Sequence, residues 1–214
     1  MPEAEQGMNV ARVIGALAGL PNTTPAITIN RFCSSGLQSI AYAAERIMIG
    51  HATAIIAGGV ESMSMIPMVG NNPRLNPKVA EEMPAYYMGM GHTAEQVAQK
   101  YNVSREDQDA FAARSHELAE KAMKEGKFKD EIVPVVIPQK KGEPVVFDTD
   151  EFPKFGTTID KVAKLKPAFK KDGIVTAANA SGINDAGAAV VVMSKEKAEE
   201  LGIKPMCTIK SYAR

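Results

Sequence analysis

Over residues 25–60 the spacing of apolar side chains changes twice, and this change constrains the fold more than any other feature. Isoleucines alternate with a β-branched threonine over 25–32, which predicts a strand. Apolar residues then follow helical spacing over 36–50, and a short apolar run over 52–60 ends at a glycine pair. Strand, helix and strand with short connections predict an α/β fold with a parallel-rich mixed sheet and covering helices.

This pattern is interrupted beyond about residue 65, where Pro, Gly, Asn and Met become frequent and no clear period is left. Helices are then predicted to begin at Thr93 and Ser104, because a polar or acidic residue follows each of them three positions later. An apolar run over 187–194 has the composition of a strand. We therefore expect a helical insertion, roughly 65–183, within an α/β domain.

Composition narrows the class of protein. The 214 residues carry 25 basic and 25 acidic side chains, so charge does not draw the whole molecule toward nucleic acid or an anionic membrane. No apolar run approaches the roughly 20 residues of a membrane span, and the first ten residues lack the pattern of a secretory signal. Two cysteines make neither a disulfide framework nor a zinc site and fit a reducing compartment. We expect a cytoplasmic protein without a metal.

The cysteine at position 33 lies where the predicted strand ends and the next helix begins. Ligands of α/β proteins bind at the carboxyl ends of parallel strands. Free backbone N–H groups and the positive end of the helix dipole lie at the start of the helix, and both favour a thiolate. The same N–H groups can bind an oxyanion formed on a carbonyl substrate. This position fits a nucleophile, although it also fits a cysteine that simply packs.

Four long segments resemble segments of the thiolase family, in the same order, and the resemblance extends over essentially the whole chain. They are "NRFCSSG", "IIAGGVESMS", "YYMGMGHTAEQVAQKYNVSREDQDAFAARSH" and "VTAANASGINDAGAAVVVMS". The resemblance implies a partial thiolase-like fold that corresponds to the central portion of the family chain. It implies four stretches: a partial N-terminal α/β domain (1–64), a loop domain (65–183), a return to the N-terminal domain (184–204) and the start of a C-terminal domain (205–214).

The resemblance also implies a reaction, the thiolytic cleavage of a 3-ketoacyl-CoA by CoA or the reverse Claisen condensation. Such an acyltransferase serves fatty-acid β-oxidation or acetoacetyl-CoA metabolism, uses CoA and acyl-CoA as substrates, and needs no permanent cofactor. Cys33 would carry the acyl group as a thioester. The substrate-binding residues implied are four contacts of the pantetheine arm and one basic residue near the CoA nucleotide, namely Met90, Ala177, Ser181, Ile183 and Lys154. Family members assemble as homodimers or homotetramers.

Three family segments do not occur in these 214 residues. They are an Asn-Glu-Ala-Phe-Ala segment, a Gly-His-Pro segment and a Cys-x-Gly-Gly-Gly segment, which supply the catalytic asparagine, histidine and second cysteine. We therefore expect this chain alone to be inactive, because it offers no group for proton transfer. Two alternatives stay open: a non-catalytic acyl-CoA-binding or assembly module, and a ketoacyl-synthase-like condensing enzyme. The segment "GHTAEQVAQ" argues against the second, because that class lacks this loop domain.

The remaining cysteine and the histidines are expected to play structural parts. His51 follows a helix, where a cation complements the dipole, and His116 belongs to a helix with charged neighbours and is expected to be solvated. His92 is expected at the entry of a helix, with a catalytic role as the alternative. Cys207 alternates with apolar neighbours, which predicts a packed strand residue.

Overall fold

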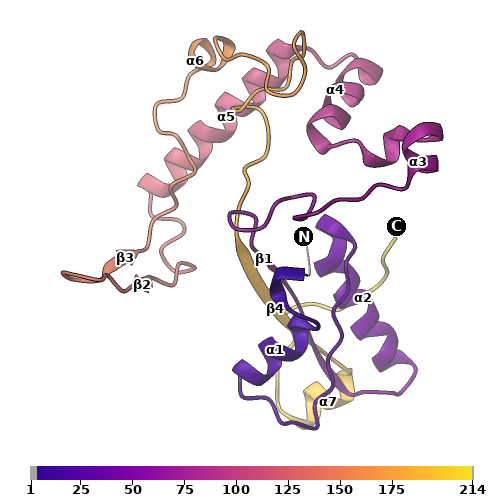
Figure 1. Cartoon of the computed structure of the whole chain (residues 1–214). Helices are drawn as coiled ribbons and strands as arrows, with labels where there is room; N and C mark the ends of the chain where they lie inside the picture. Colours follow the sequence, from indigo (N-terminus) through magenta and orange to yellow (C-terminus); the bar gives the residue numbers. More distant parts are fainter. Residues whose placement is uncertain (1–3, 214) are drawn as a thin grey trace. The chain divides into compact units, whose positions relative to one another are not determined.

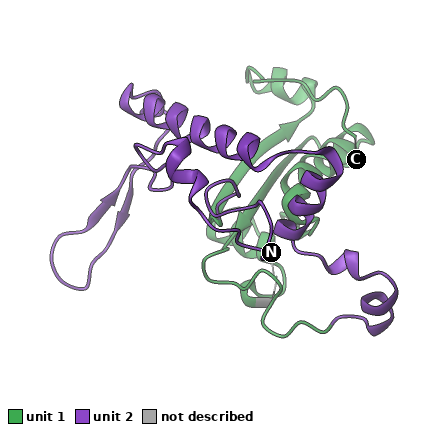
Figure 2. Ribbon diagram, turned by 90° about the horizontal axis from the view of Figure 1, so that it is seen from above, with its two compact units in different colours: residues 1–74, 183–214 green, residues 75–182 purple. Residues whose placement is uncertain are grey.

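The computed structural model describes residues 4–213, which form two compact units coloured separately in Figure 2. The first unit comprises residues up to 74 and from 183 onward, and the second comprises 75–182. The chain thus leaves the first unit once and returns to it once. The domain limits implied by the family resemblance stay a prediction.

A two-stranded sheet forms the centre of the first unit (Figure 1). Strand β1 (Ala54–Glu61) pairs antiparallel with β4 (Ala186–Met193), and helix α2 (Ser35–Met48) packs against both strands. The two strands approach closely because Gly58 faces the backbone of β4, where an added Cβ would lie 2.5 Å from a carbonyl oxygen. The strand expected over 52–60, the helix over 36–50 and the strand over 187–194 are therefore confirmed.

The predicted strand over 25–32 is wrong, since this segment belongs to no sheet. Its polar groups instead bind helix α1 (Val10–Leu17). The side chain of Asn9, the residue that caps α1, donates to the carbonyl oxygen of Ala26 at 3.1 Å. The Thr28 hydroxyl accepts from a backbone N–H of α1 at 3.1 Å. With this segment outside the sheet, both strand pairs among residues 4–213 are antiparallel, and the expected parallel pairing is not found there.

The second unit contains a 3₁₀ turn, Pro84–Tyr87, and four α-helices: α3 (Pro77–Glu82), α4 (Met90–Tyr101), α5 (Arg105–Lys124) and α6 (Ile159–Ala163). Helix α5 begins as predicted, because the Ser104 hydroxyl accepts from the N–H of Asp107 at 3.0 Å. Helix α4 begins at Met90, three residues before the predicted start. Thr93 lies inside its first turn, where the hydroxyl donates to the carbonyl oxygen of Gly89.

Two short strands and one short helix complete the fold. Strand β2 (Val135–Ile137) pairs antiparallel with β3 (Val145–Phe147) in the second unit, and α7 (Lys195–Glu200) follows β4 in the first. No helix among residues 4–213 is long and apolar enough to cross a membrane.

Candidate functional site

Cys33 is the middle residue of a 3₁₀ turn, Phe32–Ser34, that leads directly into α2. Its side chain is exposed. Phe32 has a φ of +49°, a left-handed conformation that non-glycine residues seldom adopt. The Asn30 side chain accepts from the N–H of Phe32 at 2.9 Å. The chain therefore makes a sharp, strained turn immediately before the cysteine.

Ser35 closes this turn from the helix side. Its hydroxyl accepts from the N–H of Arg31 at 2.8 Å and donates to the carbonyl oxygen of Phe32 at 2.7 Å. The Arg31 guanidinium in turn donates to the side chain of Gln38 at 2.5 Å. Local hydrogen bonds, rather than burial, thus hold Cys33 at the N-terminus of a 14-residue helix, where the helix dipole favours negative charge. An exposed thiol at such a position can attack an electrophilic carbonyl.

The second candidate residue in the first unit, Ile183, lies just before β4 with its side chain 65% exposed. The chain here is fixed by Asp185, whose carboxylate accepts from both the hydroxyl and the N–H of Ser64. These hydrogen bonds, the hydroxyl one first, lower the pKa of Asp185 below its usual value. Asp185 therefore fastens the chain entering β4 to the chain leaving β1, in keeping with a structural part.

Met90 is the first residue of α4 and is 67% exposed. The start of this helix packs on Phe169. Gly91 lies so close to that ring that an added Cβ would overlap it, and the His92 ring meets it edge-on with centroids 6.2 Å apart. Packing on Phe169 accounts for His92 as a helix-entry residue. Met90 also lines an open cavity of about 420 Å³ with apolar residues of α4.

Ala177 and Ser181 are exposed residues of a loop that is otherwise half-buried and follows the buried pair Val175 and Thr176. The N–H groups of Ile174 and Val175, just before this loop, donate to the carboxylate of Glu95. Sequence reasoning missed Glu95, although a signal was present. Glu95 and Ala98 share the buried side of α4, and a carboxylate on that side must find donors.

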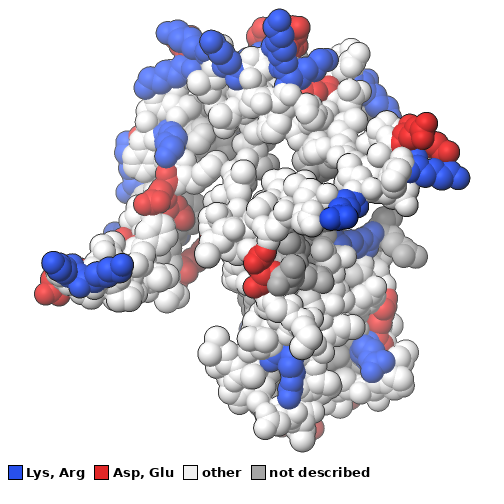
Figure 3. Space-filling view, viewed as in Figure 1, with Lys and Arg blue, Asp and Glu red and all other residues white. Residues whose placement is uncertain are grey.

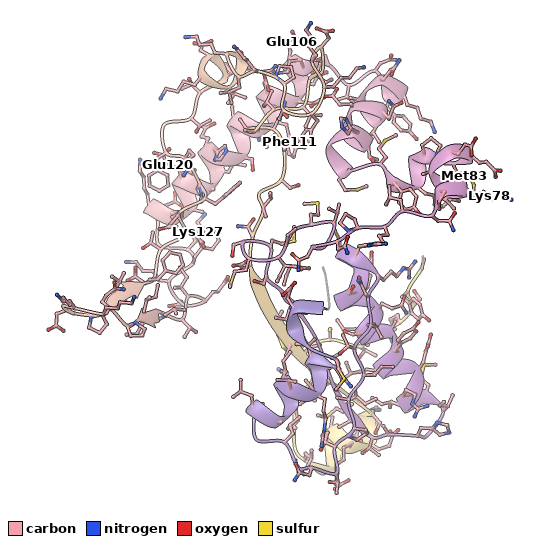
Figure 4. The ribbon with its side chains drawn as sticks, viewed as in Figure 1. Lys78, Met83, Glu106, Phe111, Glu120 and Lys127 are labelled. Carbon is pink, nitrogen blue, oxygen red and sulfur yellow. The ribbon has the colours of Figure 1, made fainter. Side chains whose placement is uncertain are left out.

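Lys154, the predicted nucleotide contact, has an exposed side chain on a segment held by α5. Its N–H donates to Nδ1 of His116 at 3.2 Å, and the N–H of Gly156 donates to the carboxylate of Glu120 at 2.7 Å. Lys124, and then this N–H, lower the pKa of Glu120, a residue labelled on α5 in Figure 4. His116 is half-buried on α5 and accepts the hydrogen bond from Lys154, so it is less solvated than predicted.

Positive charge gathers near α5 and α6, at the top of the view in Figure 3. Five exposed lysines contribute to this part of the chain: Lys161, Lys164, Lys166, Lys170 and Lys171. An open cavity of about 740 Å³ between α5 and residues 156–159 is lined by acidic and basic side chains alike. Its mixed charge favours no single ligand.

Cys207 does not pack. It is exposed and lies in a segment without a strand, so the predicted role is wrong. Among residues 4–213 no group of three or more His, Cys, Asp or Glu side chains could hold a metal ion.

Comparison with known proteins decides the family. The model of the thiolase N-terminal domain matches residues 1–196. The chain belongs to the thiolase family. It is 59% identical to a 3-ketoacyl-CoA thiolase of Bacillus subtilis (strain 168), over 99% of this chain and 56% of that protein. It is 50% identical to an acetyl-CoA acetyltransferase of Chromobacterium violaceum, over 98% of this chain and 57% of that protein.

Solved structures agree with this thiolase assignment. The acetyl-CoA acetyltransferase of Syntrophomonas wolfei superimposes with a TM-score of 0.81 at 42% identity, over 94% of this chain and 53% of that one. The acetyl-CoA acetyltransferase of Bacillus anthracis superimposes with a TM-score of 0.77 at 44% identity, over 95% of this chain and 54% of that one. The α/β, thiolase-like fold class is confirmed, and the chain spans about half the length of the relatives it matches.

Proposed function

We propose that this chain supplies the acyl-accepting half of a thiolase, with Cys33 as the nucleophile. The observation that carries the proposal is the exposed thiol of Cys33 at the N-terminus of α2, within a chain that matches the thiolase N-terminal domain over residues 1–196. The relatives are named 3-ketoacyl-CoA thiolase and acetyl-CoA acetyltransferase. The substrates proposed are therefore acyl-CoA and CoA.

In the proposed reaction the Cys33 thiolate attacks the 3-keto carbon of a 3-ketoacyl-CoA. The bond between C2 and C3 breaks, the acyl group stays on sulfur as a thioester, and the departing acetyl-CoA carbanion takes up a proton. The thiol of a second CoA then attacks the thioester, loses its proton, and returns Cys33 as a thiolate. Exchange between two thioesters is nearly balanced in energy, so sulfur suits both steps.

The substrate contacts rest on the family match and on exposure. Met90, Ala177, Ser181 and Ile183 are all exposed and are proposed to meet the pantetheine arm. The Ser181 hydroxyl makes no hydrogen bond within residues 4–213 and is available to an amide of that arm. Lys154 is the proposed contact of the nucleotide, as a mobile point charge for phosphate.

Carbon–carbon bond cleavage also needs proton transfer, for which these 214 residues contain no segment of the family type. The loss of one general acid or base slows a reaction by about 10²–10⁴-fold. We therefore expect this chain by itself to accept an acyl group on Cys33 and to cleave 3-ketoacyl-CoA poorly or not at all. The direction of the reaction, degradative cleavage or biosynthetic condensation, would then be a property of the whole protein.

The test is mass spectrometry of the chain after incubation with acetyl-CoA, with peptide mapping. Cys33 and Cys207 are both exposed, which makes Cys207→Ser a matched control for Cys33→Ser. The proposal predicts one acetyl group, found on Cys33 in the wild type and in Cys207→Ser and lost in Cys33→Ser. Tight CoA binding without any acetyl-cysteine would favour the non-catalytic binding module instead.

A further inference from the structure

The polar interior of the second unit is concentrated around one loop. Among residues 4–213, three polar or charged residues are buried: Glu95 (8% exposed), Asp109 (2%) and Thr176 (0%). All three lie in the second unit, and the side chain of each accepts a hydrogen bond from a residue of the loop 173–179. Burying polar groups is costly unless every group finds a partner. No buried side-chain polar atom in the described part of the chain lacks one.

Glu95 binds the beginning of this loop. Its Oε1 accepts from the N–H groups of Ile174 at 3.0 Å and Val175 at 2.9 Å, and its Oε2 lies 3.1 Å from the N–H of Ile174. Gly173 makes room for the carboxylate, because an added Cβ would overlap Oε1. A charged acceptor for backbone N–H groups forms stronger hydrogen bonds than a neutral one. The carboxylate therefore fixes the backbone two residues before Ala177.

Asn179 binds the loop from its other side. Its side chain accepts from the N–H of Thr176 at 2.7 Å and donates to the carbonyl oxygen of Ile174 and to Asp109, both at 3.0 Å. Asp109 also receives the Arg105 guanidinium at 2.6 Å, so its buried charge is paired. The loop is thus tied to α5 as well as to α4.

These contacts connect residues that are proposed above to contact the substrate. Helix α4 carries Met90 at its start and Glu95 in its second turn. The start of α4 packs through Gly91 on Phe169, and the N–H of the residue before that ring donates to the carbonyl oxygen of Val175 at 2.9 Å. Met90 and Ala177 are therefore attached to one hydrogen-bonded frame, while their own side chains are exposed.

We infer that Glu95 and Asn179 are positioning residues that set the distance between Met90 and the loop of Ala177 and Ser181, so that both meet the pantetheine arm of one acyl-CoA. This inference rests on the proposed function. Both residues make their side-chain hydrogen bonds within the second unit, whereas Cys33 belongs to the first. Their part is to hold substrate contacts in place before binding, which spares the ordering cost of a loose loop.

The experiment combines two measurements on the 214-residue chain. The first is hydrogen–deuterium exchange of the peptide that covers residues 170–182. The second is the rate of Cys33 acetylation as a function of acetyl-CoA concentration. Four variants are compared: Glu95→Ala, the conservative Glu95→Gln, Asn179→Ala, and the control Gln99→Ala. Gln99 is exposed on α4 and makes no hydrogen bond within the described residues.

The inference predicts slow exchange of the amides of Ile174, Val175 and Thr176 in the wild type. Glu95→Ala and Asn179→Ala speed this exchange and raise the acetyl-CoA concentration for half-maximal acetylation about 10- to 100-fold. The acetylation rate at saturation changes less than about twofold, because Cys33 belongs to the other unit. Glu95→Gln keeps one acceptor oxygen and falls between wild type and Glu95→Ala, while Gln99→Ala matches the wild type. If the two residues only stabilised the fold, their loss would not raise the half-saturating acetyl-CoA concentration while leaving the maximal acetylation rate unchanged.

Two results would overturn the inference and leave the proposed function standing. The first is fast exchange over residues 174–176 in a wild type that still acetylates Cys33. The second is a variant with a loosened loop and an unchanged half-saturation concentration. A wild type that never acetylates Cys33 would overturn the proposed function and this inference together. If Glu95→Ala does not fold, Glu95→Gln and Asn179→Ala decide between these outcomes.

Discussion

Gly173 lies against the carboxylate of Glu95 so closely that any side chain at position 173 would occupy the place of Oε1. Glycine is therefore required at position 173 because of the neighbouring carboxylate, and not because the backbone there is left-handed. Glu95 comes from α4 and Gly173 from the far end of the second unit's chain, 78 residues later. The close contact brings the hydrogen-bonded loop onto the helix that carries Met90.

Gly173→Ala is predicted to destabilise the protein by about 1–3 kcal/mol, because the new methyl group forces the buried carboxylate off its two N–H donors. The measurement is urea unfolding. Gly187→Ala in β4 is the control, since a Cβ there would meet nothing within 4 Å and its φ is not positive. That variant should not be destabilised, because alanine loses less conformational entropy than glycine in a strand. Equal free energies of unfolding for the two variants would contradict the close contact between Gly173 and Glu95.

The strained residue before Cys33 gives a second prediction. Phe32 is exposed and has a φ of +49°, which a β-branched residue tolerates poorly. Phe32→Val should therefore cost about 1–3 kcal/mol of stability, although little apolar surface is lost. Phe111→Val is the control on α5 (Figure 4), because Phe111 is 78% exposed and its backbone is helical. A loss in the control as large as in Phe32→Val would exclude backbone strain as the cause.

The pKa of Asp185 gives a third prediction. Its pKa in the folded chain lies below the usual value of 3.8, because Ser64 donates two hydrogen bonds to the carboxylate. Because the pKa is lower in the folded chain than in the unfolded chain, the ionised carboxylate stabilises the folded chain, and this stabilisation is complete at pH values well above 3.8. That contribution is lost as the pH falls from 3.8 through the lower folded value.

Removing the Ser64 hydroxyl should move the pKa of Asp185 upward, toward the usual value. The measurement is an NMR titration of the Asp185 side-chain carbon in Ser64→Ala. Ser62→Ala is the control, because the Ser62 side chain makes no hydrogen bond within residues 4–213. An unchanged pKa in Ser64→Ala, or an equal rise in Ser62→Ala, would contradict the assignment of the shift to Ser64.

The elements with strong local signals were predictable from the sequence. Helix α5 begins at the cap of Ser104, and Gly126 with its φ of +69° follows its end, as the pattern indicates. The segment over 25–32 alternates like a strand but is bound to the start of α1 through Ala26 and Thr28, whose partners lie 17 residues earlier in the sequence. Strand β3 has three apolar residues in a polar stretch, too few to show a period.

The candidate site was predictable only where one residue and its neighbours carry the chemistry. Cys33 was identified from the change of period around it, and the structure places it at the start of α2. Glu95 was missed because a glutamate on a helix is usually solvated, and its donors lie about 80 residues away. Such a partnership becomes visible only when the fold brings both segments together.

The most direct test of the central claim, that Cys33 carries the acyl group, is exchange of isotopically labelled CoA into unlabelled acetyl-CoA by this chain. The exchange needs only transfer of acetyl to Cys33 and back, so it requires no proton transfer to carbon. We predict exchange in the wild type and in Cys207→Ser and its loss in Cys33→Ser. Exchange that persists in Cys33→Ser, or that is absent from the wild type, would contradict the account.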